Sequence, residues 1–390
     1  MILVRRTLAQ ACAVAAASLV GLSVIPAQAA TSGTGWHVNH VIGAGNQNYD
    51  PDWPGGLAAG STNSAWLIWS GCTLPCAGGN TTTALEHWNG RQWTRVPAAR
   101  IQGITPDAVA ASTGSSAWLL GDTVRKSGSS DQTVFKTLYW NGATWKTRSV
   151  PAKPVYINGS GELDAYLAGF GPMAAWLFSL GGYVGQTSAY AEHYHNGRWH
   201  KSSLPDVPNS VAAISDSDVW AIGQPIGKSS TVLMHWNGRK WTTSRFPAQP
   251  KSGYVTGLAG TGHSDLWATW TPQSSNASYL LHDTGHGWKR VNLPARDQLS
   301  GAGQLFSDGH GGVWLLANGP APKYTWLFVH LSAAGRWTST KVPDAKGLQD
   351  LNVDELALVP GTSSVWAAGH AFGPTSLDSP NRVVIWRYRP

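Results

Sequence analysis

The sequence predicts an all-β fold, a seven-bladed β-propeller built from four-stranded antiparallel blades. Two repeated patterns and the composition of the chain ends lead to this prediction. The first pattern is an apolar strand with a central Trp, which follows small or acidic residues. It occurs seven times, at Trp66, Trp118, Trp176, Trp220, Trp267, Trp314 and Trp366. Successive copies are separated by about 50 residues on average, a period typical of propeller blades.

The second pattern is a β-hairpin tip, clearest at His235–Trp241, where Asn237-Gly238 supplies the turn. Strands enter and leave this tip, as expected for the two outer strands of a blade. Further copies, some of them degenerate, are His87–Trp93, Tyr139–Trp145, Tyr194–Trp199, His282–Trp288 and Gly335–Trp337.

One period accommodates four short strands. In the fourth period these are a small-residue strand at Val211–Ile214, the Trp220 strand, the strand Val232–Trp236 and the strand Trp241–Phe246. A Pro usually follows the last strand, here Pro247. Because Pro cannot donate to a strand ladder, it fits an outer edge. Small residues therefore belong at the centre of the ring, with Trp between neighbouring sheets.

The two ends of the chain predict how the ring closes. The strand Val383–Arg387 follows the seventh Trp strand, and no outer strand comes after it. Near the other end, Gly35–Val38 resembles an outer strand that has no blade of its own. We therefore expect blade 7 to comprise about 353–390 plus strand 35–41. Such closure removes free sheet edges.

Residues 1–29 are predicted to be a signal peptide. Arg5 and Arg6 precede an apolar stretch at 11–25, and Ala27-Gln28-Ala29 fits a cleavage site. The apolar stretch is short for a membrane span, and no later segment reaches that length. We expect a secreted, extracellular, monomeric bacterial protein whose residues 30–390 form the propeller.

Cys72 and Cys76 lie in one glycine-rich loop of the expected mature chain. In an oxidising compartment they are predicted to form a disulfide. A bridge that closes so short a loop would stabilise the loop more than the fold. A redox or metal role is the alternative, but the sequence supplies no second Cys pair or nearby His to complete such a site.

The charge of the chain argues against nucleic-acid binding. Only 13% of residues are charged and the formal net charge is +7, whereas globular domains have about 25% charged residues. The Lys and Arg residues are scattered and form no basic stripe. Attraction to acidic cell-wall polymers remains compatible with this composition.

The Asn-Gly-x-x-Trp tips and the Asp-x-Trp strands, such as Asn237–Trp241 and Asp218–Trp220, resemble repeats of secreted bacterial seven-bladed propellers. These are described as galactose-oxidase-like, kelch-like or WD40/YVTN-like, and Asp283–Trp288 is similar to a degenerate Asp-box of sialidase-type propellers. The resemblance, over 35–390, implies a fold and leaves function open. A galactose-oxidase-like copper centre would need a Cys cross-linked to Tyr, whereas both mature Cys residues share one loop. The predicted inner strands also lack the Arg residues of a sialidase site.

Aromatic residues that depart from the repeat are the first candidates for ligand binding. These are Trp53, Trp69, Trp270, Trp326, Tyr324 and Phe372. Trp69 and Trp270 lie three residues after a repeat Trp, where other blades have small residues. The topology places all six on one face, near blades 5, 6, 7 and 1. Exposed aromatic rings there would stack on sugars or hold peptide side chains. Alternatively, they pack beneath long loops.

Acidic residues at the mouth of the channel are the second candidates. Asp107, Asp164 and Glu355 occupy similar positions at the start of inner strands, with Asn209 at the equivalent place in blade 4. A ring of oxygen ligands could hold Ca²⁺, and paired carboxylates could perform acid–base hydrolysis. The alternative is that they are solvated residues at strand starts.

The histidines predict no metal site. His87, His235 and His282 recur three residues before the turn glycine on different blades, which indicates a structural role. His193 and His195 share one strand face but lack a third ligand. We therefore expect no resident cofactor, unless Ca²⁺ occupies the channel mouth.

These observations favour a non-catalytic secreted propeller that binds an extracellular polysaccharide or protein through its loop-bearing face. The alternative is a glycan-active hydrolase or lyase that uses the carboxylates at the channel mouth. A bare scaffold in the cell envelope is a third reading. The sequence has no Gly-x-Ser-x-Gly or His-Glu-x-x-His motif to indicate an enzyme.

Overall fold

The computed structural model of the chain describes twelve segments. They are residues 34–43, 49–73, 81–127, 130–148, 165–179, 189–223, 231–246, 253–272, 278–293, 305–318, 325–373 and 381–390. Gly33–Pro390 form one compact unit. The predicted signal peptide, Cys76, the side chain of Cys72, Asp164 and Tyr324 lie outside the described residues. No helix among the described residues is long and apolar enough to cross a membrane.

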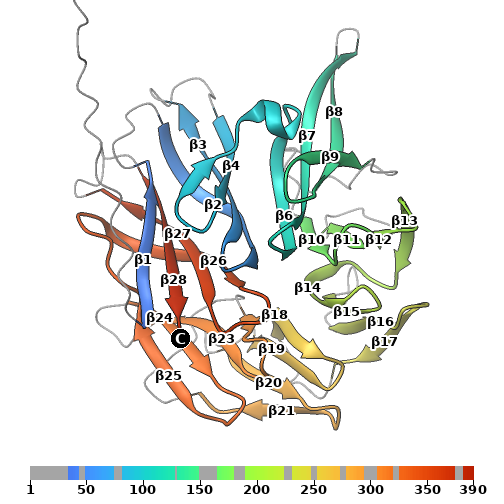
Figure 1. Cartoon of the computed structure of the whole chain (residues 1–390). Coiled ribbons are helices and arrows are strands. Elements are labelled where there is room, and N and C mark those ends of the chain that lie inside the picture. The colour runs from blue at the N-terminus through green and yellow to red at the C-terminus, as the bar shows by residue number, and fades with distance from the viewer. Residues whose placement is uncertain are drawn as a thin grey trace, which may run out of the picture. The chain divides into compact units, whose positions relative to one another are not determined.

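The described part of Gly33–Pro390 forms seven four-stranded antiparallel sheets, arranged as the blades of a ring (Figure 1). Blade 1 consists of β2 (Tyr49–Ser61), β3 (Ser64–Thr73), β4 (Thr81–Trp88) and β5 (Trp93–Arg95). The 3₁₀ turn η1 (Ala98–Ile101) leads into blade 2, which consists of β6 (Thr105–Thr113), β7 (Ser116–Ser127), β8 (Ser130–Trp140) and β9 (Trp145–Arg148). Blade 3 consists of β10 (Ala165–Gly169), β11 (Ala175–Ser179), β12 (Ala189–His195) and β13 (Arg198–Leu204).

The remaining blades continue in chain order. Blade 4 consists of β14 (Pro208–Ser215), β15 (Asp218–Gly223), β16 (Val232–Trp236) and β17 (Trp241–Arg245). Blade 5 consists of β18 (Gly253–Gly262), β19 (Asp265–Pro272), β20 (Tyr279–Asp283) and β21 (Trp288–Val291). Blade 6 consists of β22 (Leu305–Ser307), β23 (Val313–Asn318), β24 (Trp326–Leu331) and β25 (Trp337–Lys341). Blade 7 consists of β26 (Gln349–Leu358), β27 (Val365–Phe372), β28 (Arg382–Arg389) and β1 (Gly35–Ile42).

The N-terminal strand closes the ring, which confirms the sequence prediction. β1 pairs antiparallel with β28, from Gly35 opposite Arg389 to Ile42 opposite Val383. Blade 7 therefore takes three strands from the end of the chain and one from its beginning. Its inner strand starts at Gln349, a few residues before the predicted boundary.

The core is divided among the junctions between blades. Each of seven buried apolar clusters contains residues from two neighbouring blades. The repeat Trp faces the following blade: Trp66 packs with blade 2, for instance, and Trp366 packs with blade 1. Glycine permits the closest approaches. A Cβ atom at Gly169 of blade 3 would lie 2.6 Å from Cδ1 of Trp118 in blade 2.

In five blades the repeat Trp stacks on a cross-strand histidine of the third strand. The ring centroids lie 3.6–4.3 Å apart. The pairs are Trp66–His87, Trp176–His193, Trp220–His235, Trp267–His282 and Trp314–His330. Tyr139 takes this position in blade 2. Arg387 takes it in blade 7, with its guanidinium 4.6 Å from the centre of the Trp366 ring.

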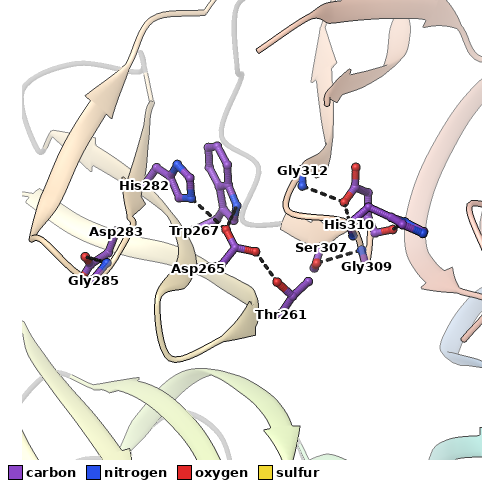
Figure 2. A network of polar contacts seen from close by, with 11 residues as sticks. Thr261, Asp265, Trp267, His282, Asp283, Gly285, Ser307, Gly309, His310 and Gly312 are labelled. Carbon is purple, nitrogen blue, oxygen red and sulfur yellow. Dashed lines mark hydrogen bonds and ion pairs between the residues drawn. The ribbon is translucent and has the colours of Figure 1, made fainter. Parts of the chain in front are cut away.

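The stacked histidine is anchored at its other edge. In blades 3 to 6, Nε2 donates to an Asp carboxylate at 2.7–2.8 Å. In blade 5 the acceptor is Asp265, which also accepts from Trp267 Nε1 at 3.1 Å and from the Thr261 hydroxyl (Figure 2). The contacts of His87, His235 and His282 thus support the structural role predicted for them.

The hairpin tips form as predicted. Asn89, Asn141 and Asn237 each accept two backbone N–H bonds through Oδ1 at 2.9–3.1 Å. The glycines that follow them have φ between 85° and 93°. Glycine adopts this left-handed conformation without the steric cost of a Cβ atom.

The stacking of β1 against blade 6 yields a test of ring closure. The Trp36 ring lies 3.7 Å from that of Phe328 and is 9% exposed. Trp36→Ala should therefore lower the free energy of unfolding by about 3–5 kcal/mol in urea titrations. Trp53, which is 51% exposed, is the matched control, and Trp53→Ala should change stability by less than about 1 kcal/mol. Equal effects of the two variants would contradict closure by β1.

Candidate functional site

Aromatic and polar side chains gather where blades 6, 7 and 1 meet, at the face on which the inner strands begin. The pairing of Gln349 with Phe372 places the start of β26 beside the end of β27. Trp326 likewise begins β24 opposite the end of β23. We call this region the 6–7–1 surface and define it by Trp53, Trp326, Asp350, Asn352, His370 and Phe372.

A cavity of about 460 Å³ opens between blades 6 and 7 on this surface. Its lining comes from the start of β24, the end of β25, the segment that leads into β26 and the first residues of β26. The polar and aromatic lining residues are Trp326, Lys341, Asp344, Gln349, Asp350 and Asn352. Lys341 and Asp344 form an exposed ion pair at 2.8 Å, and such pairs contribute little to stability.

Trp326 forms a wall of the cavity and joins the two blades. Its indole Nε1 donates to Asn352 Oδ1 at 3.1 Å. Asn352 Nδ2 in turn donates to the carbonyl oxygen of Asp350 at 3.0 Å. The half-buried ring is therefore held in one orientation beside the polar lining, which is the arrangement expected of a preformed ligand pocket.

Asp350 has an unusual backbone. Its φ of 51° lies in the left-handed region. The strand register jumps from Gln349 opposite Phe372 to Asn352 opposite His370, so Asp350 belongs to a bulge. Asp visits this region more readily than most residues, yet the conformation still costs on the order of 1 kcal/mol. The bulge presents an exposed carboxylate at the cavity.

The surface continues into blade 1 through aromatic contacts. The Trp53 ring meets His370 edge-on, with centroids 5.0 Å apart. His370 also lies 5.9 Å from Phe372, and its Nδ1 donates to Asp354 Oδ2 at 2.7 Å. Among the described tryptophans, only Trp53 has as much as half of its surface exposed.

The structure separates the predicted aromatic candidates into two groups. Trp53 and Phe372 both contact His370 on the 6–7–1 surface, and Trp326 is bonded to Asn352, the strand partner of His370. Trp69 and Trp270 are 2% and 3% exposed, so they correspond to the packing alternative and present no ring to a ligand. Trp69 Nε1 donates to Glu86 Oε1 at 3.3 Å, and Trp270 stacks on Tyr279 at 5.5 Å. Tyr324 lies outside the described residues.

The acidic candidates are spaced differently from the prediction. Asp107 occupies the bulge of β6, between Pro106 and Ala108. The equivalent bulge residue of β26 is Asp354, because the register there skips from Val353 to Glu355. Glu355 is therefore one position beyond the place predicted for it. Asp164 lies outside the described residues.

The described acids do not assemble into a calcium site. Asp354 is bonded to His370, and Asp107 is near Asp122. The one group of three potential metal ligands among the described residues comprises Asp218, His235 and His263, far from the predicted mouth of the channel in sequence and on the opposite face.

Asp107 is nevertheless electrostatically unusual. Burial raises its pKa to about 7, and the negative charge of Asp122 adds to the effect. Its Oδ2 atom is buried without a hydrogen-bond partner among the described residues. A carboxyl group of this kind is protonated over much of the acidic pH range and can act as a proton donor.

Sequence reasoning missed Asp350, Asn352, Asp354 and His370. Two signals were present. His370 lies four residues after its repeat Trp, where the other blades have no histidine. The polar run before the inner strand of blade 7 was a second departure from the small-residue pattern.

Comparison with known proteins supports the fold and assigns the chain to no family. No family model and no curated protein matches the sequence. Among solved structures, YCF48 from Cyanidioschyzon merolae has a TM-score of 0.54 and 13% identity over 91% of this chain and 99% of that chain. YCF48 bound to D1 peptide has a TM-score of 0.52 and 14% identity, with coverage of 92% and 96%.

A third similar structure is the β-propeller domain of the Trilobed protease from Pyrococcus furiosus. Its TM-score is 0.54 and its identity 9%, over 87% of this chain and 94% of that chain. The chain has a seven-bladed propeller fold. At such low identity the likeness extends to fold alone, and the kelch, WD40 or Asp-box type resembled by the repeats stays a prediction.

The elevated pKa of Asp107 predicts a pH-dependent effect of Asp107→Asn. An unfolded chain releases this proton near pH 3.9, whereas the folded chain holds it up to about pH 7. The stabilising contribution of the protonated group is complete below about pH 4 and is lost as the pH rises through 7. As the pH rises from about 4 to 8, the free energy of unfolding of the Asn variant should increase relative to that of the parent by roughly 1–3 kcal/mol, measured by urea unfolding. A stability difference that is independent of pH would contradict this assignment.

Proposed function

We propose that this chain is a secreted, non-catalytic binding propeller that takes an extracellular glycan on the 6–7–1 surface. One observation supports this most: the cavity between blades 6 and 7 has a fixed Trp wall and a strained, exposed Asp. The exposed Trp53 ring contacts His370, the strand partner of the lining residue Asn352. Strained backbone conformations concentrate at functional sites.

The chemistry of the lining favours sugars. Carboxylate and amide groups such as those of Asp350, Gln349 and Asn352 pair with hydroxyl groups, which donate and accept. The flat face of an indole ring covers the apolar C–H face of a sugar ring. The cavity would take one sugar unit, and Trp53 would contact a neighbouring unit of the same chain.

A protein segment is the second candidate ligand. Propellers of this fold include YCF48, which was solved bound to D1 peptide. That similarity concerns the fold alone, so peptide binding is kept as an alternative outcome of the test. Peptide binding that requires Trp53, and that glycans do not compete away, would support a protein ligand.

A glycan-active hydrolase or lyase is the alternative function, and the elevated pKa of Asp107 is the observation that favours it. Hydrolysis needs two carboxyl groups within about 10 Å of each other, one of them protonated. Asp122 is the neighbouring carboxyl group. Glycan cleavage by the parent that is lost in Asp107→Asn would replace the non-catalytic proposal.

A glycan array, followed by titration of the best ligand, tests the proposal. Trp53→Ala and Asp350→Asn should each lower the affinity at least tenfold, about 1.4 kcal/mol. Asn tolerates the left-handed backbone, so the second change removes charge and leaves the bulge intact. The matched control is Met173→Ala, because Met173 is 57% exposed and lies in the turn between β10 and β11, on the opposite face. Equal affinities of parent and all three variants would contradict the proposal.

A further inference from the structure

The residue at one position of the repeat contacts the preceding blade. It lies four residues before the repeat Trp, in or near the turn that joins the first two strands of a blade. In blade 4 this residue is Asp216, whose Oδ1 accepts from His193 Nε2 of blade 3 at 2.7 Å. In blade 1 it is Thr62, whose carbonyl accepts from Arg387 Nη2 of blade 7 at 3.2 Å. The position therefore lies over the third-strand side chain that stacks on the preceding blade's repeat Trp.

In blade 5 the same position is His263, and it brings a third potential ligand to the stack of blade 4. His235 stacks on Trp220 at 3.9 Å and donates through Nε2 to Asp218 Oδ1 at 2.8 Å. The His263 ring centroid lies 5.1 Å from that of His235. One ligand atom from each of Asp218, His235 and His263 lies within 4.8 Å of the others.

We propose that Asp218, His235 and His263 bind a divalent first-row transition-metal ion such as Zn²⁺, which would bridge blades 4 and 5. Zn²⁺ takes imidazole nitrogen and carboxylate oxygen at about 2.0–2.2 Å, in tetrahedral geometry. Two imidazoles favour Zn²⁺, Cu²⁺ or Ni²⁺ over Ca²⁺ and Mg²⁺, which prefer all-oxygen ligands.

The three residues need little rearrangement to close around an ion. Ligand atoms of a tetrahedral zinc site are separated by roughly 3.4 Å, a distance that follows from the bond lengths. His263 is exposed, so a change in its side-chain rotamer can bring its ring nitrogen closer. The stacked Trp220 fixes the plane of His235, as outer contacts do for metal-binding histidines. The metal would replace the His235 Nε2 proton that now bonds to Asp218. The proton would move to Nδ1 or, if Nδ1 is already protonated, be released to solvent.

The site is open to solvent and has room for a further ligand. The side chains of Asp218 and His235 are 24% and 16% exposed. Three protein ligands leave a fourth tetrahedral position for water or for a donor group of another molecule. The site lies on the face that carries the hairpin tips, opposite the 6–7–1 surface, so the two proposals stand independently.

The next junction offers a built-in comparison, because Asp265, His282 and His310 repeat the same residue types. There, His310 Nδ1 is within 2.9 Å of the Asp308 carbonyl oxygen, and Figure 2 shows its ring pointing away from Asp265. Asp265 already accepts from Thr261, Trp267 and His282. Among the described residues this trio does not meet as a ligand group, so the inference applies to blades 4 and 5 alone.

Calorimetric titration of the untagged chain with Zn²⁺ tests the proposal. The parent should bind one Zn²⁺ ion at a site that His263→Ala weakens at least tenfold. Asp218→Asn should weaken it as well, whereas His310→Ala should leave the affinity within about twofold. Because His263 and His310 are both turn residues near the surface, their variants should fold alike, and circular dichroism checks this.

Two further readouts connect the binding to this geometry. Co²⁺ should give the visible absorption of a four-coordinate ion with the parent and with His310→Ala, and this absorption should be lost in His263→Ala. Zn²⁺ should also raise the thermal unfolding midpoint of the parent and not that of His263→Ala, since a ligand that binds only the folded state stabilises it. Equal zinc affinities of the parent and His263→Ala, or the absence of zinc binding by the parent, would overturn the proposal.

Discussion

Stacking of the second-strand tryptophan on its cross-strand neighbour is the interaction on which the rest of the structure depends. The Trp faces the following blade, and in blades 3 to 6 the stacked histidine is tied to a carboxylate by a 2.7–2.8 Å hydrogen bond. The indole thereby fills the junction, and the carboxylate accepts the hydrogen bond of the half-buried imidazole N–H. Each junction buries apolar residues of two blades, so no blade has a complete core of its own.

This dependence separates structural positions from functional ones. Residues that repeat in every blade are occupied in holding the junctions, and the N-terminal strand extends the same packing around the ring through Trp36. Binding chemistry is therefore expected where a blade departs from the repeat, alone or together with repeat residues. The bulge at Asp350, His370 at the end of β27 and the exposed Trp53 are such departures on one face. His263 is another on the opposite face, where a ligand-type residue takes the position that contacts the preceding blade.

Much of the fold could be predicted because the Trp strands and the Asn-Gly tips mark each blade in the sequence. The candidate site was less predictable. Trp69 is three residues from Trp66, so the two rings point to opposite sides of a strand that is covered by a blade on each side. A large residue at that position is therefore buried, and its size said nothing about exposure. The spacing of the acids was also hard to predict. Asp107 and Asp354 each occupy a one-residue bulge, three positions before the Ala that pairs with the repeat Trp, and the connection from that Ala to the Trp is one residue longer in blade 7 than in blade 2.

The central claim is that the stacked imidazole and its carboxylate act together to hold the junctions between blades. A double-mutant cycle at blade 5 tests it most directly, with the free energy of unfolding measured for the parent, His282→Ala, Asp265→Ala and the double variant. The 2.8 Å hydrogen bond between the two side chains predicts a coupling energy of about 1–2 kcal/mol, because each single variant leaves the other group without this partner. Strictly additive effects of the two substitutions would contradict the claim.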